Sequence, residues 1–219
     1  MKIFEDLYAF LWADPTTNNC NTYFINGSKK ILVDPGHAHL FNHVREGLAA
    51  LSLTPSDMDI VLITHAHPDH MEGVNVFADT PALVALHHSE TESARQATSH
   101  YDQHLGATRL EPDILLREGN IQIGDMDFRV IHAPGHSPGS IALYWSEKKV
   151  LFSGDVIFSR GIGRTDLPGG NGNALKDSIK ALSQLDVEIL LPGHGDMVLG
   201  REQVKANFNE IERVWFAYL

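Results

Sequence analysis

The chain of 219 residues contains very little cysteine and has fewer basic than acidic side chains. Its one cysteine, Cys20, excludes an intrachain disulfide and indicates a reducing compartment, where buried packing is its expected role. The formal net charge of -11 argues against a nucleic-acid-binding protein, because such proteins need a basic surface, and it also disfavours binding to anionic membranes. No apolar run approaches the ~20 residues of a membrane span.

The first residues also lack the features of a secretion signal. Glu5 and Asp6 stand where a signal peptide would have basic residues followed by a long apolar run. We therefore expect a cytoplasmic protein whose partner is a small-molecule substrate, with no nucleic acid and no membrane among its partners. The sequence leaves monomer and homodimer open.

Hydrophobic periodicity predicts strands and helices throughout the chain, with no linker or repeat between its halves. A length of 219 residues suffices for one domain with a sizeable core, so we predict a single domain over residues 1–219. The predicted strands are 2–12, 21–26, 30–34, 59–63, 81–86, 120–123, 127–132, 140–145, 149–152 and 187–191. The predicted helices are 39–52, 69–77, 89–104, 172–185 and 201–217. This mixture suggests one sandwich of two sheets covered by helices.

Three histidines and one aspartate lie within six residues, directly after the apolar run 60–63. A strand that ends in such a polar loop presents these side chains at the edge of a sheet. We expect His65 and His67 to bind one metal ion, and Asp69 and His70 to turn toward a second. Imidazole nitrogens and carboxylate oxygens suit zinc, iron and manganese. A solvated histidine-rich loop is the alternative.

Three later loops share this property, because each places a metal-capable side chain after an apolar strand. These side chains are His136, Asp155 and His194. One such loop would be weak evidence, but four in this order resemble the metallo-β-lactamase superfamily over nearly the whole chain. The resemblance implies an α+β fold, an αββα sandwich in which two mixed sheets are flanked by helices. It places the site at one edge of the two sheets.

The resemblance also implies a site for two divalent metal ions, with zinc expected and iron or manganese as alternatives. The implied ligands are histidines and aspartates of the four loops: His65, His67 and His136 for the first ion, Asp69, His70 and His194 for the second, and Asp155 bridging both.

The chemistry of such a site explains why these residue types are needed. Two cations a few ångströms apart hold a water or hydroxide and lower its pKa toward neutrality. Asp155 offsets part of the paired positive charge, and Asp69 both ligates and orients the hydroxide, so these two aspartates are the predicted catalytic residues. No side-chain nucleophile is required, which agrees with the absence of a Gly-x-Ser-x-Gly elbow.

A glycine-rich segment, residues 159–170, follows Asp155 and contains Gly161-Ile162-Gly163-Arg164. It resembles the Gly-x-Gly-Arg element of the glyoxalase II group and its relatives, including the persulfide dioxygenases. The chain as a whole is most similar to the short glyoxalase II-like hydrolases, which implies hydrolysis of a thiol ester such as a hydroxyacylglutathione. The resemblance gives Arg164 a substrate-binding role, as a fork for a carboxylate or peptide carbonyl. A structural ion pair of Arg164 is the alternative. The chain lacks the aromatic residue that follows the basic residue in glyoxalase II itself. Hydrolysis of a thiol ester is therefore a firmer expectation than recognition of glutathione.

Two other enzyme classes fit the same residues. In a mononuclear iron persulfide dioxygenase, the resemblance implies iron on His65, His136 and Asp155, and two histidines with one carboxylate suit non-haem iron. A lactonase would apply the hydrolase chemistry to a cyclic ester. A metal-binding structural module is the non-enzymatic alternative.

Three residues outside the implied ligand set are further candidates for a role in the site. Asp34 ends a predicted strand and could orient a ligand imidazole from behind, or it could simply form the Asp34-Pro35-Gly36 turn. His37 and His88 have the best case for a role in the site among the eight other histidines, which are otherwise expected on the surface or in the core.

Overall fold

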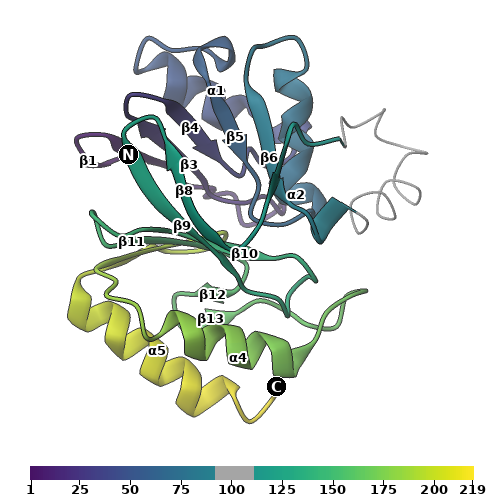
Figure 1. Ribbon diagram of the computed structural model, residues 1–219, viewed down its shortest axis with the longest axis vertical. Coiled ribbons are helices and arrows are strands. Elements are labelled where there is room, and N and C mark those ends of the chain that lie inside the picture. The colour runs from purple at the N-terminus through teal and green to yellow at the C-terminus, as the bar shows by residue number, and fades with distance from the viewer. Residues whose placement is uncertain (92–110) are drawn as a thin grey trace. The chain divides into compact units, whose positions relative to one another are not determined.

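The computed structural model describes residues 1–91 and 111–219 of the chain. Backbone contacts divide it into two compact units, Met1–Leu116 and Arg117–Leu219. Each unit has one large mixed β-sheet and helices (Figure 1). Each also has a hydrophobic core of its own. The single domain over residues 1–219 stays a prediction. Among the described residues, no helix is both long enough and apolar enough to cross a membrane.

Among the described residues of the first unit, seven strands form one sheet, in the order in which they occur in the sequence. The first four strands pair antiparallel, and the fourth to the seventh pair parallel. Because parallel strands run in the same direction, the loops after β4 and β5 emerge at the same edge of the sheet. The strands are β1 Lys2–Phe4, β2 Leu7–Phe10, β3 Thr22–Asn26, β4 Lys30–Val33, β5 Ile60–Leu62, β6 Leu83–His87 and β7 Ile114–Leu116.

Short helices connect these strands. Val44 and Leu48 lie on the buried side of α1 and belong to the same core cluster as Phe24 of β3. Burial of each such aliphatic side chain contributes about 1.5–3 kcal/mol relative to exposure. Pro68 occupies the first position of α2, which starts the helix directly after His67. The helices are α1 Asn42–Ala49, α2 Pro68–Met71 and the 3-10 helices η1 Ala38–Leu40, η2 Pro55–Asp57 and η3 Glu72–Phe77.

Six strands form the larger sheet of the second unit, in the order β15-β14-β11-β10-β9-β8. Neighbours pair antiparallel, except that β11 and β14 run parallel with Leu151 opposite Leu190. A two-stranded sheet of β12 Ile157–Phe158 and β13 Gly161–Ile162 follows β11 in the chain. The strands of the larger sheet are β8 Gly119–Ile123, β9 Met126–His132, β10 Ile141–Trp145, β11 Val150–Gly154, β14 Ile189–Pro192 and β15 Val198–Leu199.

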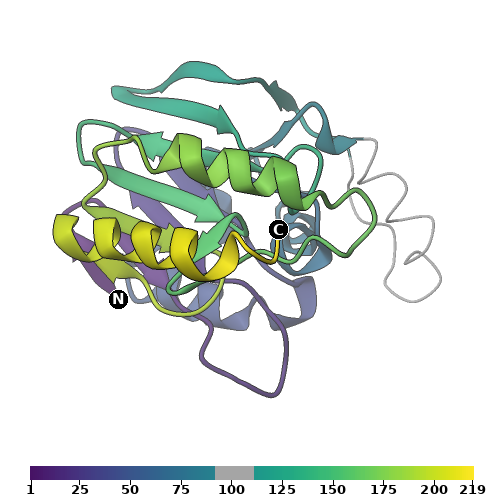
Figure 2. The same cartoon turned by 90° about the horizontal axis from the view of Figure 1, so that it is seen from below.

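Two helices, α4 Gly172–Leu182 and α5 Arg201–Trp215, run side by side across one face of this sheet (Figure 2). Their apolar side chains recur at helical spacing and join those of the sheet in one core cluster. Asn171 caps α4, because its side-chain oxygen accepts a hydrogen bond from the backbone N of Ala174 at 3.0 Å. The buried apolar residues are Leu175, Ile179 and Leu182 of α4 and Val204, Phe208 and Ile211 of α5.

The structure differs from the predicted elements in several places. Residues 2–12 form two strands rather than one, because the chain turns at Glu5 and Asp6 and β1 pairs back on β2. The predicted helix 39–52 divides into η1 and a shorter α1, and the predicted helix 69–77 divides into α2 and η3. The predicted helix 89–104 lies largely outside the described residues. Strands β7, β12, β13 and β15 were not predicted, since two or three residues carry too little periodicity.

Candidate metal centre

In the first unit, Asp34 links the ends of two neighbouring parallel strands. It follows β4 with a φ of 53°, a left-handed conformation that aspartate adopts more readily than most residues. Its Oδ1 accepts a hydrogen bond from the backbone N of Thr64 at 2.8 Å, and its Oδ2 accepts one from the Thr64 hydroxyl at 2.7 Å. Asp34 is 2% exposed, so these bonds satisfy a buried carboxylate and fix the loop after β5.

The carboxylate of Asp34 also orients His70. Nδ1 of His70 lies 2.8 Å from Oδ2 of Asp34. Because an ionised carboxylate can only accept, this Nδ1 carries the proton and Nε2 carries the lone pair. The structure thus brings Asp34 to the imidazole of a predicted ligand and selects the tautomer that binds metal through Nε2.

Thr64 extends this network to His65. The Thr64 hydroxyl donates to Asp34, so its oxygen accepts from Nδ1 of His65, which lies 3.1 Å away. Nε2 of His65 lies 3.1 Å from Nδ1 of His67. Two nitrogens that bind one tetrahedral zinc at 2.0–2.1 Å are about 3.3 Å apart, so this spacing fits a shared ion. The rings of His65 and His70 are also adjacent, with centroids 4.1 Å apart.

Two residues that are distant in the sequence hold the loop of residues 64–70 in place. Neither was predicted to have a role in the site. Asn18 donates a hydrogen bond from Nδ2 to Oδ2 of Asp69 at 2.7 Å. Glu90, which is 1% exposed, accepts a hydrogen bond at 2.8 Å from the backbone N of Ala66, the residue between His65 and His67. No local pattern marks Asn18 or Glu90, because each acts through a contact that exists only in the folded chain.

In the second unit, Asp155 and His194 follow the two parallel strands of the larger sheet. Asp155 comes directly after β11, and His194 comes two residues after the end of β14. The backbone N of Gly193 donates to the carbonyl of Gly154 at 2.9 Å, which holds the two loops together. Oδ2 of Asp155 accordingly lies 3.4 Å from Nε2 of His194. Neighbouring parallel strands therefore bring these two predicted ligands to one place.

His136, in the loop after β9, approaches the same carboxylate oxygen. Its Nε2 lies 3.6 Å from Oδ2 of Asp155. Its Nδ1 lies 2.7 Å from the backbone carbonyl of Arg164, and because a carbonyl only accepts, Nδ1 carries the proton. The lone pair is then on Nε2, the atom nearer to Asp155. One carboxylate oxygen with two histidine nitrogens 3.4 and 3.6 Å away provides the oxygen and nitrogen donors that ions of the zinc class bind.

Two glycines let backbone segments pack directly against these loops. A Cβ at Gly163 would lie 1.8 Å from the backbone oxygen of Asp155, and a Cβ at Gly135 would lie 2.2 Å from the backbone N of Leu175. No side chain fits at either position without displacing backbone. The Gly-x-Gly-Arg element thus supports the loops of Asp155 and His136 through close backbone packing and through the carbonyl of Arg164.

The chain matches a known family along most of its length. Residues 15–194 match the sequence model of the metallo-β-lactamase superfamily. The chain belongs to this superfamily. Its two mixed sheets with helices are those of the metallo-β-lactamase fold, which confirms the predicted family and the predicted α+β class.

Several similar proteins align with four fifths or more of the chain. A probable metallo-hydrolase of Bacillus subtilis is 36% identical over 188 residues, which cover 80% of this chain and 84% of the relative. The hydroxyacylglutathione hydrolase GloC of Haemophilus influenzae is 31% identical over 207 residues, which cover 86% of this chain and 91% of GloC. The solved structure of TTHA1623 in a di-iron-bound form has a TM-score of 0.71 at 30% identity and covers 92% of this chain and 95% of that chain. The BLEG-1 B3 metallo-β-lactamase has a TM-score of 0.74 at 33% identity, with coverages of 90% and 95%.

The side chain of Arg164 forms a two-bond ion pair with Asp166, in which both N–O distances are 2.7 Å. The hydrogen bond from Arg164 lowers the pKa of the Asp166 carboxyl to about 2. The Arg164 side chain is 61% exposed and that of Asp166 67% exposed. The structural ion pair that we gave as the alternative is therefore present, whereas the substrate role of Arg164 stays a prediction.

His37 and His88, the two outlying candidates, lie in different surroundings. Nδ1 of His37 lies 2.7 Å from Oε2 of the buried Glu72, so His37 belongs to a polar cluster of the first unit. His88 is exposed, and its Nδ1 lies 3.2 Å from the hydroxyl of the adjacent Ser89. The lone cysteine, Cys20, is buried as predicted.

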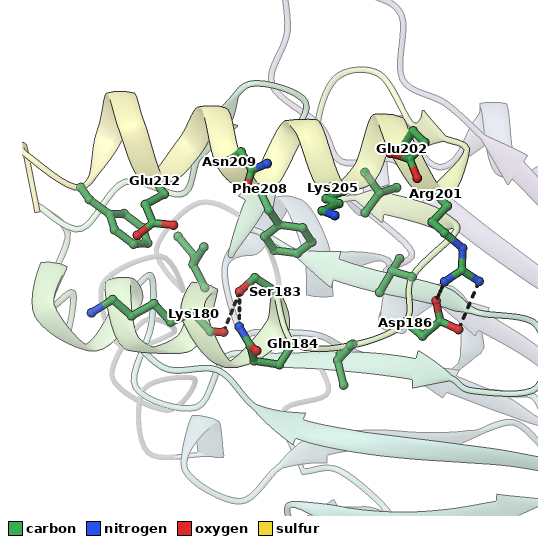
Figure 3. Close-up of a pocket in the computed structure, with 15 residues that line it drawn as sticks. Lys180, Ser183, Gln184, Asp186, Arg201, Glu202, Lys205, Phe208, Asn209 and Glu212 are labelled. Carbon is green, nitrogen blue, oxygen red and sulfur yellow. Dashed lines mark hydrogen bonds and ion pairs between the residues drawn. The ribbon is translucent and has the colours of Figure 1, made fainter.

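A groove of about 380 Å³ lies between α4 and α5 (Figure 3). Phe208 lies among its apolar lining residues, and Arg201 at one end forms an ion pair with Asp186. None of the seven predicted ligands lines this groove, so we assign it no part in the candidate centre.

Proposed function

We propose that this member of the metallo-β-lactamase superfamily is a binuclear metallohydrolase. The observation that carries the proposal is the placement of acceptors at Nδ1 of His65, His70 and His136, which directs the lone pair of each ring to Nε2. The di-iron form of TTHA1623 supports a centre of two ions. The proposed ligands of two divalent ions, with zinc expected, are His65, His67, Asp69, His70, His136, Asp155 and His194.

In this proposal the protein's own residues orient the nucleophile and balance the positive charge of the two ions. When bound, the two ions would supply an acidified water as nucleophile and Lewis acidity toward a carbonyl. Asp69 is held through one carboxylate oxygen by Asn18 and would orient the nucleophile by accepting a hydrogen bond. Asp155 is 8% exposed and would offset the paired positive charge where water contributes little screening.

We further propose a thiol ester as the substrate, with a hydroxyacylglutathione as the first choice. Support comes from GloC, which is 31% identical over 91% of its own length, and from the Gly-x-Gly-Arg element. The exposed guanidinium of Arg164 presents two parallel N–H donors, which a substrate carboxylate could take over from Asp166. A thiolate leaves readily near neutral pH, so the reaction needs no strong general acid. The expected location is cytoplasmic.

The test is hydrolysis of a hydroxyacylglutathione by the holoprotein. The reaction is monitored through the loss of thioester absorbance, and a lactone and a β-lactam are assayed in parallel. We expect a kcat/KM for the thiol ester of about 10⁴ M⁻¹ s⁻¹ or more. Asp155→Ala should abolish this activity, whereas Asp177→Ala, on the exposed side of α4, should retain it. A thiol-ester rate no higher than that of Asp155→Ala would refute the proposed activity.

A further inference from the structure

A second group of metal-capable side chains lies in the first unit and includes none of the seven proposed ligands. We call His37, His39 and Glu72 the His37 cluster. His37 precedes η1, His39 lies within η1, and Glu72 begins η3. One donor atom of each residue lies within 4.8 Å of the donor atoms of the other two.

The carboxylate of the His37 cluster is buried, which favours a cation beside it. Glu72 is 6% exposed, and its Oε2 lies 2.7 Å from Nδ1 of His37. A buried carboxylate costs free energy unless positive charge or hydrogen bonds compensate for the lost water. Nδ1 of His37 donates such a hydrogen bond to Glu72, and an ion held between these two atoms would replace the shared proton. The ring of His39 stands 5.1 Å from that of His37, centroid to centroid, and completes the group from the exposed side.

Backbone hydrogen bonds hold His37 and Glu72 in place. The N of Gly36 donates to the carbonyl of His70 at 3.3 Å, and the N of Gly73 donates to the carbonyl of Gly36 at 2.6 Å. The N of His37 donates to Oδ1 of the buried Asn19 at 2.8 Å. Two of the three side chains therefore start from fixed backbone positions, and only the exposed His39 is needed to adjust its rotamer.

We propose that the His37 cluster binds one further divalent transition-metal ion of the zinc class. Two histidines with one glutamate form a donor set that zinc uses, with the remaining positions open to water. Three atoms within 4.8 Å of one another lie no more than about 2.8 Å from a common centre, so movements below about 1 Å would bring them to zinc distance.

The position of the His37 cluster gives such an ion a defined structural effect. His37 lies three residues after Asp34, and Glu72 lies two residues after His70. Asp34 and His70 are joined by the 2.8 Å hydrogen bond behind the candidate metal centre. An ion on His37 and Glu72 would add to this bond and to the backbone hydrogen bonds between the same two segments, and so raise the thermal stability of the first unit.

The test is calorimetric titration of the purified holoprotein with zinc chloride, after elemental analysis has counted the ions already bound. His39→Ala is the principal variant, because His39 is exposed and its loss should not affect folding. His88→Ala, which removes an exposed histidine outside the cluster, is the matched control. We expect one additional binding event in the wild type and in His88→Ala, and at least a tenfold weaker event in His39→Ala.

A second readout uses cobalt(II) as the added ion, because its visible absorption reports on the ligands. Wild-type protein should develop a new band for the added ion, and Glu72→Gln should lose that band while keeping the ions counted beforehand. An unchanged zinc affinity in His39→Ala, or no additional event in the wild type, would overturn the proposal. The initial ion count judges the binuclear centre separately, so the two proposals can fail independently.

Discussion

At the scale of single residues, the proton position on each imidazole determines what that imidazole can bind. The Asp34 carboxylate at His70 and the Arg164 carbonyl at His136 both require a proton on Nδ1. A neutral ring with this tautomer offers its lone pair at Nε2, the form that binds a metal ion. Removing such an acceptor should therefore weaken metal binding while every ligand remains in the chain.

Asp34→Asn tests this account directly. One carboxylate oxygen becomes an NH₂ group that faces N–H or O–H donors of Thr64 and His70, so the ring loses its fixed tautomer. We expect about 10–100-fold weaker metal affinity, measured by competition with a chelator. Asp59→Asn is the control, because Asp59 accepts hydrogen bonds at the opposite end of β5. Equal affinity in Asp34→Asn and the wild type would contradict the account.

Arg164→Ala separates the backbone of residue 164 from its side chain. The variant keeps the carbonyl that accepts from His136, so its metal content should not change. It loses the exposed guanidinium, so KM for an anionic thiol ester should rise several-fold, in steady-state assays, if the substrate displaces Asp166. Arg160→Ala, which removes another exposed arginine, is the control. An unchanged KM would remove the proposed substrate contact.

The same variant should also change the titration of Asp166. The hydrogen bond from Arg164 is the main reason that the pKa of Asp166 lies at about 2, and without it we expect a value closer to the ordinary ~3.9. Because the folded-state pKa is depressed, the stabilisation from this pair is present at neutral pH and is lost as the pH falls from about 4 through 2. Carboxyl ¹³C shifts measured against pH check this. A wild-type Asp166 that already titrates near 3.9 would refute the ion pair in solution.

The ligands of the site could be predicted from the sequence, but the residues that hold them in place could not. The histidines and aspartates of the loops could be found, because metal binding demands a few residue types directly after strands. Asn18 and Glu90 could not, since an asparagine or glutamate looks like any other in the sequence until the fold brings it to Asp69 or Ala66. The pairing of Arg164 with Asp166 was open for a similar reason, because an exposed arginine has many partners within reach.

At the scale of elements, α4 and the loop of His136 act together. The backbone N of Asn171 donates to the carbonyl of Gly135 at 2.7 Å, and the hydroxyl of Ser178 donates to the carbonyl of Pro134 at 2.8 Å. The helix thereby supports the residues immediately before His136. Periodicity could predict α4 from its apolar face, but these loop contacts depend on glycine packing that no periodic pattern reveals.

Asn171→Ala should destabilise α4 without removing a ligand or either of those loop contacts. Loss of the cap to Ala174 should lower the free energy of unfolding by about 0.5–2 kcal/mol, measured by urea denaturation. Asn171→Ser keeps a capping oxygen and should recover most of this loss. If Asn171→Ala is as stable as the wild type, the cap contributes nothing to α4.

At the scale of the whole molecule, the superfamily match over residues 15–194 spans all four ligand loops. Two divalent ions would offset four of the eleven excess negative charges and leave the protein acidic, in keeping with a small-molecule substrate. The family and the α+β class could be predicted because the order of the four loops is specific. Substrate preference could not, because metallo-hydrolases and a β-lactamase occur at similar identity to this chain.

The most direct test of the binuclear centre is the metal content per chain of freshly purified protein prepared without added metal, measured by elemental analysis. We expect about two tightly held ions per chain in the wild type, most of them zinc, and loss of metal in Asp155→Ala. A third, weaker ion at the His37 cluster is removed by dialysis before counting. One iron per chain and no second tightly held ion would refute the binuclear centre and indicate mononuclear oxygen chemistry instead.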